Sequence, residues 1–360
     1  MKTFRIALLP GDGIGPDVTE EAVRVLRAVE ARVDGLRLET EEFSIGAGEF
    51  LKNGHPLPES VVDRLPEFHA ILLGAMGLPD VRWPDGVEMT PQLDLRERLD
   101  LYQGLRPIYL FHPDDSPLGG RRAGDIDFLL VRESTEGLFS SRKAPRDPAA
   151  DRATDTMLIT RAGSERVIRA AFQLALRRRK RVTLVDKANV LPSMAFFRQV
   201  FDEVAREFSG VETDRVYVDA AALYLVRQPE MFDVIVTENM FGDILSDLAA
   251  ALVGGMGMAP SADIGERYAV FQPSHGSAPD IAGRGIANPV ATILSAAMML
   301  DWLDTPATLR GAGMIHEAVR SVFSDRKART RDMGGVLSTS QMGDAIIGAL
   351  PRSADPKITR

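Results

Sequence analysis

Two aspartates, Asp243 and Asp247, are the side chains of this 360-residue chain best placed to bind a divalent cation. They stand one helical turn apart in residues 239–248, where apolar residues recur at helical spacing, so both carboxylates share a face. Two hard oxygen ligands in this arrangement suit Mg²⁺ or Mn²⁺. The plainer interpretation is that Asp243 caps the helix or interacts with its dipole, and that Asp247 is solvated.

A lysine and a third aspartate follow two other apolar segments. Lys187 comes after the strand-like residues 182–185, where partial desolvation would lower its pKa and make it a candidate general base. The alternative is a lysine that pairs with its neighbour Asp186. Asp219 is predicted at the end of a further strand and is a third candidate metal ligand.

Three arginines are candidate carboxylate readers, because the planar guanidinium binds both carboxylate oxygens. Arg96 and Arg106 lie ten residues apart, and Arg132 follows the apolar residues 128–131. Together they could bind a dicarboxylate. Each of them alone is better explained by a surface position or a salt bridge.

Residues 274–283 form a loop rich in glycine and small side chains, and Asn288 follows it. Such a loop can offer backbone amides to phosphates, the Asp280 carboxylate to a ribose and the Asn288 amide to adenine. The competing interpretation is a long surface loop.

Alternating apolar strands and amphipathic helices predict an α/β fold that would position these groups. The first strand leads into Gly11-x-Gly13, but Pro16 stands where a dinucleotide-binding Rossmann motif needs its third glycine. Strands are predicted at 6–9, 70–74, 128–131, 182–185 and 232–237, and helices at 17–29, 220–226, 293–303 and 315–322.

Composition narrows the classes of protein further. The 45% hydrophobic content supports a large core, and the absence of cysteine excludes disulfides, thiol nucleophiles and Cys-type metal sites. A net charge of -8 argues against a nucleic-acid partner, and the basic run at 177–181 is explained by the end of a helix. No apolar run is long enough to span a bilayer and no signal peptide is evident, so we expect a cytoplasmic protein.

Seven motifs in order resemble the β-decarboxylating dehydrogenases, the family of isopropylmalate, isocitrate, homoisocitrate, tartrate and D-malate dehydrogenases. They are residues 10–16, the arginine pair, 131–133, 185–190, 217–219, 239–248 and 275–280. The resemblance implies an isopropylmalate dehydrogenase-like fold, not a Rossmann fold, in which two α/β domains share a large mixed sheet. One domain, on the cofactor side, would comprise residues 1–101 and 254–360. The other domain, residues 102–253, would contain the dimerisation surface and the metal and substrate sites. The active cleft would lie between the two domains.

The resemblance also implies roles for individual residues. Arg96, Arg106 and Arg132 would bind the substrate carboxylates, and Asp243 and Asp247 would bind the metal. Lys187 and Asp219 would reach across from the second subunit of a homodimer, Lys187 as the base and Asp219 as a catalytic residue and metal ligand. The cofactor residues would be Ile14, Asn189, His275, Gly276, Ala278, Asp280 and Asn288. The Asp280 carboxylate would repel a 2′-phosphate, which favours NAD over NADP.

Two residues depart from the family pattern. Phe139 stands where a tyrosine usually protonates the enol, and Gln272 stands where a glutamate is common, which removes a negative charge from the cofactor site. Residues 89–93 should contact the substituent on the substrate's C3, and they are neither fully aliphatic nor suited to a third carboxylate. We therefore expect a 3-isopropylmalate-like substrate, with D-malate or tartrate as the alternative. A ligand-binding paralogue without turnover is the alternative of another class.

Overall fold

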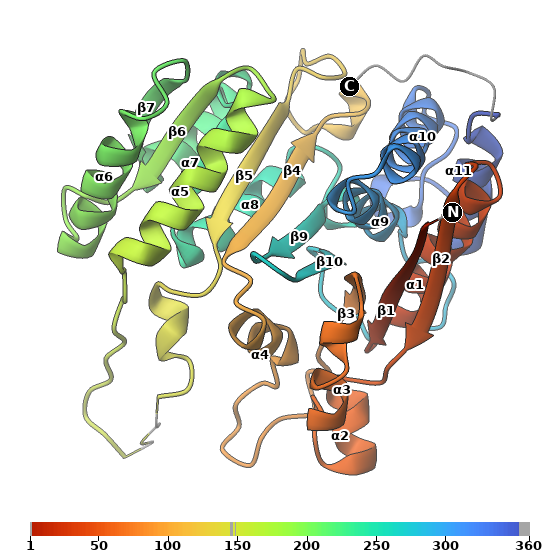
Figure 1. The fold of residues 1–360 in the computed structure, drawn as a ribbon, viewed down its shortest axis with the longest axis horizontal. Helices are drawn as coiled ribbons and strands as arrows, with labels where there is room; N and C mark the ends of the chain where they lie inside the picture. Colours follow the sequence, from red (N-terminus) through yellow and green to blue (C-terminus); the bar gives the residue numbers. More distant parts are fainter. Residues whose placement is uncertain (1, 145–146, 148, 353–360) are drawn as a thin grey trace.

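A ten-stranded mixed sheet forms the centre of the computed structural model, which describes residues 2–144, 147 and 149–352. The strands are β1 (Lys2–Gly11), β2 (Leu36–Glu42), β3 (Ala70–Ala75), β4 (Gln103–Tyr109), β5 (Asp127–Glu133), β6 (Arg181–Asp186), β7 (Glu212–Tyr217), β8 (Val234–Thr237), β9 (Pro260–Ile264) and β10 (Ala269–Pro273). The helices are α1 (Gly15–Glu30), α2 (Ala47–Asn53), α3 (Glu59–Val62), α4 (Pro91–Arg98), α5 (Arg161–Leu176), α6 (Pro192–Ala205), α7 (Val218–Arg227), α8 (Asn239–Ala251), α9 (Val290–Trp302), α10 (Pro306–Phe323) and α11 (Thr339–Ala349). Helices cover both faces of the sheet (Figure 1).

The strand order is β2-β1-β3-β10-β9-β4-β5-β8-β6-β7. The outer strands pair in parallel, whereas β10, β9, β4 and β5 pair antiparallel in the middle of the sheet. A doubly wound dinucleotide-binding sheet is mostly parallel. The antiparallel centre therefore confirms the predicted mixed sheet and the exclusion of a Rossmann fold.

The two halves of the sheet come from different parts of the chain. Strands β2, β1, β3, β10 and β9 lie within residues 1–101 and 254–360, and the other five lie within residues 102–253. The halves join where β9 pairs with β4, with Asp263 opposite Gly104. The division into two domains stays a prediction, and the strand order is in keeping with it.

Most predicted elements form and are longer than their sequence patterns indicated. Helix α9 is apolar on nearly every face because it is buried, and it packs against β9, β10 and the neighbouring α10. The prediction that Asp219 ends a strand was wrong. Strand β7 ends at Tyr217, and Asp219 lies in the first turn of α7, where a carboxylate interacts favourably with the helix dipole.

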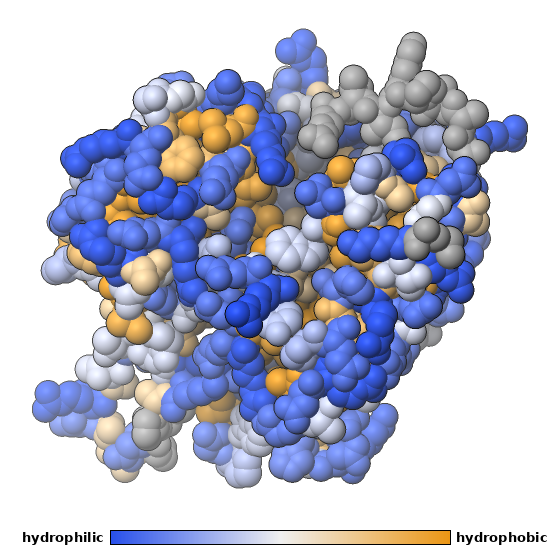
Figure 2. Space-filling model, in the orientation of Figure 1, coloured by the Kyte–Doolittle hydropathy of each residue, from blue (hydrophilic) through white to orange (hydrophobic). Residues whose placement is uncertain are grey.

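Hydrophilic residues cover most of the face drawn in Figure 2, and hydrophobic residues show there only in small patches. Within the described ranges, no helix is both long enough and apolar enough to cross a membrane.

Candidate active site

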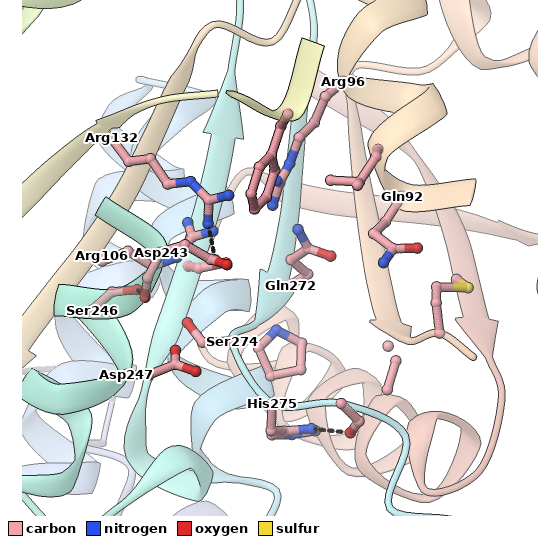
Figure 3. A pocket seen from close by; sticks show the side chains of 18 residues that line it. Gln92, Arg96, Arg106, Arg132, Asp243, Ser246, Asp247, Gln272, Ser274 and His275 are labelled. Carbon is pink, nitrogen blue, oxygen red and sulfur yellow. Dashed lines mark hydrogen bonds and ion pairs between the residues drawn. The ribbon is translucent and has the colours of Figure 1, made fainter. Parts of the chain in front are cut away.

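A cavity of about 290 Å³ brings together residues from α4, α8 and the central strands. Its lining includes the three predicted arginines, Arg96, Arg106 and Arg132, and the two predicted aspartates, Asp243 and Asp247 (Figure 3). Helix α4 supplies Arg96, while β4 and β5 supply Arg106 and Arg132. The candidate carboxylate readers and the candidate metal ligands therefore share one site.

Local capping fixes the helix that carries the aspartates. The Glu238 side chain accepts hydrogen bonds from the backbone N–H groups of Met240 (3.1 Å) and Phe241 (2.6 Å) at the N-terminus of α8. These bonds satisfy backbone donors that have no partner within the helix. Asp243 is therefore not the cap, because Glu238 fills that role.

Arg132 is almost completely buried against the first turn of α8. Its Nε and one terminal nitrogen donate to the Asn239 side-chain oxygen at 2.9 and 2.6 Å, and its other terminal nitrogen is paired with Asp243. Gly242 allows this approach, since a Cβ there would lie 2.7 Å from Arg132 Cγ. The Phe139 ring centroid lies 5.3 Å from the guanidinium carbon, so this aromatic ring forms one wall of the arginine site.

Behind the other two arginines lies Asp263, a residue that the sequence analysis missed. It is fully buried on β9, with 3.0 Å between its Oδ2 and Arg96 Nε and 4.0 Å between its Oδ1 and a terminal nitrogen of Arg106. Gln272 Nε2 donates to the same Oδ2 at 2.7 Å. A lone aspartate in the short apolar strand β9 was the signal that could have identified it.

Asp263 adds to the expectation about Gln272. The sequence indicated that glutamine at this position removes a negative charge from the cofactor site. The structure places the Asp263 carboxylate within hydrogen-bonding distance of the Gln272 amide, so another negative charge lies directly behind the neutral Gln272 side chain.

Burial and mutual repulsion control the charges of the cluster. Burial lowers the pKa of Arg106, and burial together with Arg96 lowers that of Arg132 to about 10. Burial alone would raise the pKa of Asp263, but Arg96, Arg106 and Arg132 outweigh burial and hold the pKa below its usual value. Asp263 is therefore ionised at neutral pH, and Arg132 remains cationic.

Five buried polar atoms that belong to cavity-lining residues have no hydrogen-bond partner within the described structure. They are Gln92 Oε1, Arg96 Nε, Ser261 Oγ, Ser274 Oγ and His275 Nε2. Burial lowers the pKa of His275, so its imidazole is neutral at neutral pH. A polar ligand in the cavity would satisfy such groups, which are costly to leave unpaired.

The donor set on α8 fits a divalent cation but does not complete its coordination. Partial burial and the nearby Asp243 raise the pKa of Asp247, and a bound cation would relieve this repulsion between carboxylates. Among the residues that the structure describes, no group of three or more histidine or acidic side chains could hold a metal ion. Among the described residues, one chain thus brings two candidate carboxylate ligands, Asp243 and Asp247, to this place.

The predicted base and third metal ligand lie outside the cavity. Lys187 Nζ is paired with Asp219, whose side chain is 68% exposed, and neither residue lines the cavity. The alternative pair of Lys187 with Asp186 is not formed, because Asp186 binds Arg198 Nε at 2.7 Å. Asn189, predicted at the cofactor, is exposed on the same loop as Lys187.

The other predicted cofactor residues surround the loop that follows β10. His275 and Gly276 line the cavity, and Ile14 N donates to the Ser277 carbonyl oxygen at 2.8 Å, which joins this loop to the glycine turn before α1. Ala278 has a φ of 37° and Asp280 is exposed. The Asn288 side chain donates to Asp332 at 3.0 Å, so its amide is engaged within the chain.

Comparison with known proteins agrees with this geometry. The family model of isocitrate/isopropylmalate dehydrogenases matches residues 5–346. A 3-isopropylmalate dehydrogenase of Corynebacterium efficiens is 45% identical over 353 residues, which are 96% of this chain and 99% of that protein. The crystal structure of an isocitrate dehydrogenase from Methylococcus capsulatus superposes with a TM-score of 0.87 at 38% identity, covering 96% of this chain and 99% of that one. A β-decarboxylating dehydrogenase from Thermococcus kodakarensis gives a TM-score of 0.79 at 41% identity, with 96% of each chain covered.

The chain belongs to the isocitrate/isopropylmalate dehydrogenase family. It is therefore an enzyme, a decarboxylating dehydrogenase, which confirms the family and the enzyme class predicted from the sequence.

Proposed function

We propose that the enzyme catalyses the NAD- and divalent-metal-dependent oxidative decarboxylation of a (2R)-malate-type 2-hydroxy dicarboxylate, with 3-isopropylmalate as the first candidate substrate. The observation that carries this proposal is the meeting of three buried arginines and two aspartates in one cavity. The names of relatives such as the Corynebacterium efficiens protein support the same reaction.

The cationic and the anionic side chains of the cavity have different roles in this proposal. Arg96, Arg106 and Arg132 bind the substrate carboxylates, and their burial excludes water that would weaken this attraction. Asp243 and Asp247 would hold Mg²⁺ or Mn²⁺. When bound, the cation makes the substrate hydroxyl more acidic and NAD takes up the hydride.

A second copy of the chain would supply Lys187, whose deprotonated amine would accept the hydroxyl proton, and Asp219, the third metal ligand. Two observations support this homodimer. Lys187 and Asp219 do not line their own cavity, and large hydrophobic side chains are exposed on the elements that carry Lys187, Asp219 and Asp243 or adjoin them. Those side chains are Val190 in the loop after β6, Tyr217 at the end of β7, Leu223 and Val226 on α7, and Ile244 on α8. An apolar surface of this kind is suited to bury against an identical one.

The exposed Asp280 carboxylate supports NAD as the cofactor, because it can accept hydrogen bonds from ribose hydroxyls and would repel a 2′-phosphate. The neutral His275 and the orphaned Ser274 hydroxyl are further polar groups available to the dinucleotide. A cytoplasmic location belongs to the same proposal.

The lining near α4 supports D-malate or tartrate as a second candidate substrate. Gln92 and Gln272 both line the cavity, and Figure 3 shows the Gln272 amide oxygen on the side that faces Gln92. Two amides favour a hydrogen atom or a hydroxyl on the substrate's C3 over a fully aliphatic group.

The test is steady-state NADH production with Mn²⁺ and a panel of 3-isopropylmalate, D-malate, tartrate and isocitrate. We expect a metal-dependent rate with at least one dicarboxylate, and a much lower rate when NADP replaces NAD. The proposal would be refuted if no acid in the panel raised NADH formation above the enzyme-free background.

A further inference from the structure

Asp263 is buried beneath the candidate site without touching the cavity. Its side chain is 1% exposed, and the residues through which it reaches the cavity are Arg96, Arg106 and Gln272. Ser134 Oγ donates to its Oδ1 at 3.3 Å. The contact with Arg96 Nε is an ion pair without hydrogen-bond geometry, so charge is the main link between these two side chains.

The surrounding backbone makes room for this carboxylate. Gly104 lies opposite Asp263 in the β4–β9 pair. A Cβ on Gly104 would come within 2.5 Å of Ser134 Oγ and 3.3 Å of Asp263 Oδ1, so any larger residue would press on both groups. Gln272 suits the same arrangement, because a glutamate there would set a second carboxylate against Asp263.

The charges around the cavity indicate how many negative charges a bound ligand can carry. A divalent cation would balance Asp243 and Asp247, and the Lys187–Asp219 ion pair adds no net charge as long as Lys187 holds its proton. Among the described residues that pair directly with the three arginines, Asp263 is then the one remaining counterion, which leaves a surplus of two positive charges. A dicarboxylate balances that surplus, whereas a tricarboxylate exceeds it.

We propose that Asp263 is a specificity-determining residue: as the fixed, buried counterion of Arg96 and Arg106, it tunes the cavity to dicarboxylates and disfavours tricarboxylates. The inference rests on the proposed function, since it takes a 2-hydroxy dicarboxylate as the substrate. Asp263 acts through the arginines and through Gln272 and is a positioning residue, not a catalytic one.

Asp263→Asn is a close test because it removes the charge and keeps the shape. The amide oxygen can still accept from Gln272, and the new NH₂ group would face Ser134 Oγ. The measurement is the dissociation constant of two unreactive acids, propane-1,2,3-tricarboxylate and butanedioate, by calorimetry on the Mn²⁺-loaded protein. We expect the ratio of the tricarboxylate constant to the dicarboxylate constant to fall about tenfold or more in the variant.

The matched control is Asp233→Asn. Asp233 is an equally buried aspartate that accepts from Arg178 Nε at 2.9 Å, and neither residue lines the active-site cavity. This variant should lose stability but leave the ratio unchanged. Should Asp263→Asn not fold, Asp263→Ser removes the same charge and keeps a hydroxyl that can accept from Gln272.

Two results would overturn the inference. One is wild-type protein that binds the tricarboxylate as tightly as the dicarboxylate. The other is a loss of affinity for both acids by the same factor in the variant, as a purely structural role would cause. Failure of the proposed function is distinguishable, because a protein that binds dicarboxylates in this way but oxidises none would refute turnover and leave the role of Asp263 standing.

Discussion

The arginine cavity and the Lys187–Asp219 pair both combine a cationic side chain with a carboxylate. They differ in how much of these side chains is exposed to solvent. In the cavity, Arg132 is 2% exposed and is held by Asn239 and Asp243 in one geometry. At the pair, Asp219 is exposed to solvent, and its pKa is lowered mainly by the hydrogen bond from Lys187. Both regions are formed within one chain, but the cavity groups are buried and fixed, whereas Asp219 is open to solvent.

This difference in exposure determines how strongly each set of charged side chains interacts with a ligand or with another molecule. Buried charges attract a ligand strongly because little water screens them, and they persist only when counterions such as Asp263 are fixed nearby. An exposed ion pair contributes little to stability and stays free to exchange partners. The exposed pair is therefore accessible to another molecule, as the proposed homodimer requires.

The largest expected effect comes from the cavity. Asp243→Asn should lower metal-dependent turnover about 10³-fold, because it removes one of two carboxylate ligands from α8. The protein should remain folded, since Asp243 is half exposed. NADH formation during a Mn²⁺ titration, with circular dichroism as the folding control, measures both. Fully retained activity would contradict the metal assignment.

The next effect tests whether the exposed pair acts in the partner's site. Lys187→Met should lower turnover about 10²-fold or more as the candidate base is lost. Co-expression of this variant with Asp243→Asn should then restore about a quarter of the wild-type rate, because half of the dimers are mixed and each has one intact site. If Lys187 served its own chain, no mixture of the two variants would recover activity.

The smallest expected effect concerns the wall of the cavity. Phe139→Tyr should raise product formation about tenfold or less, because a phenol beside the Arg132 guanidinium can donate the proton that a phenyl ring lacks. The comparison is the rate of CO₂ release with the rate of final product formation. An unchanged rate for both would show that another group, or water, protonates the enol.

The sequence by itself determined the features that depend on neighbours along the chain. The pair Asp243 and Asp247 was readable because residues one helical turn apart share a face in any α-helix. The mixed, non-Rossmann fold followed from Pro16 and from the ordered motifs of the family, and the three arginines were found by residue type and spacing.

Only the tertiary structure decided which of these groups meet. Asp263 meets Arg106, which lies on the strand β4 that pairs with β9, and Arg96, which comes from α4, and no local pattern encodes these contacts. The same holds for Lys187, whose partner is Asp219 instead of its neighbour Asp186. Long-range strand pairing brings charged side chains together, and burial then sets the strength of the interaction between them. Because both depend on tertiary structure, neither the contact nor its strength can be predicted from spacing along the chain.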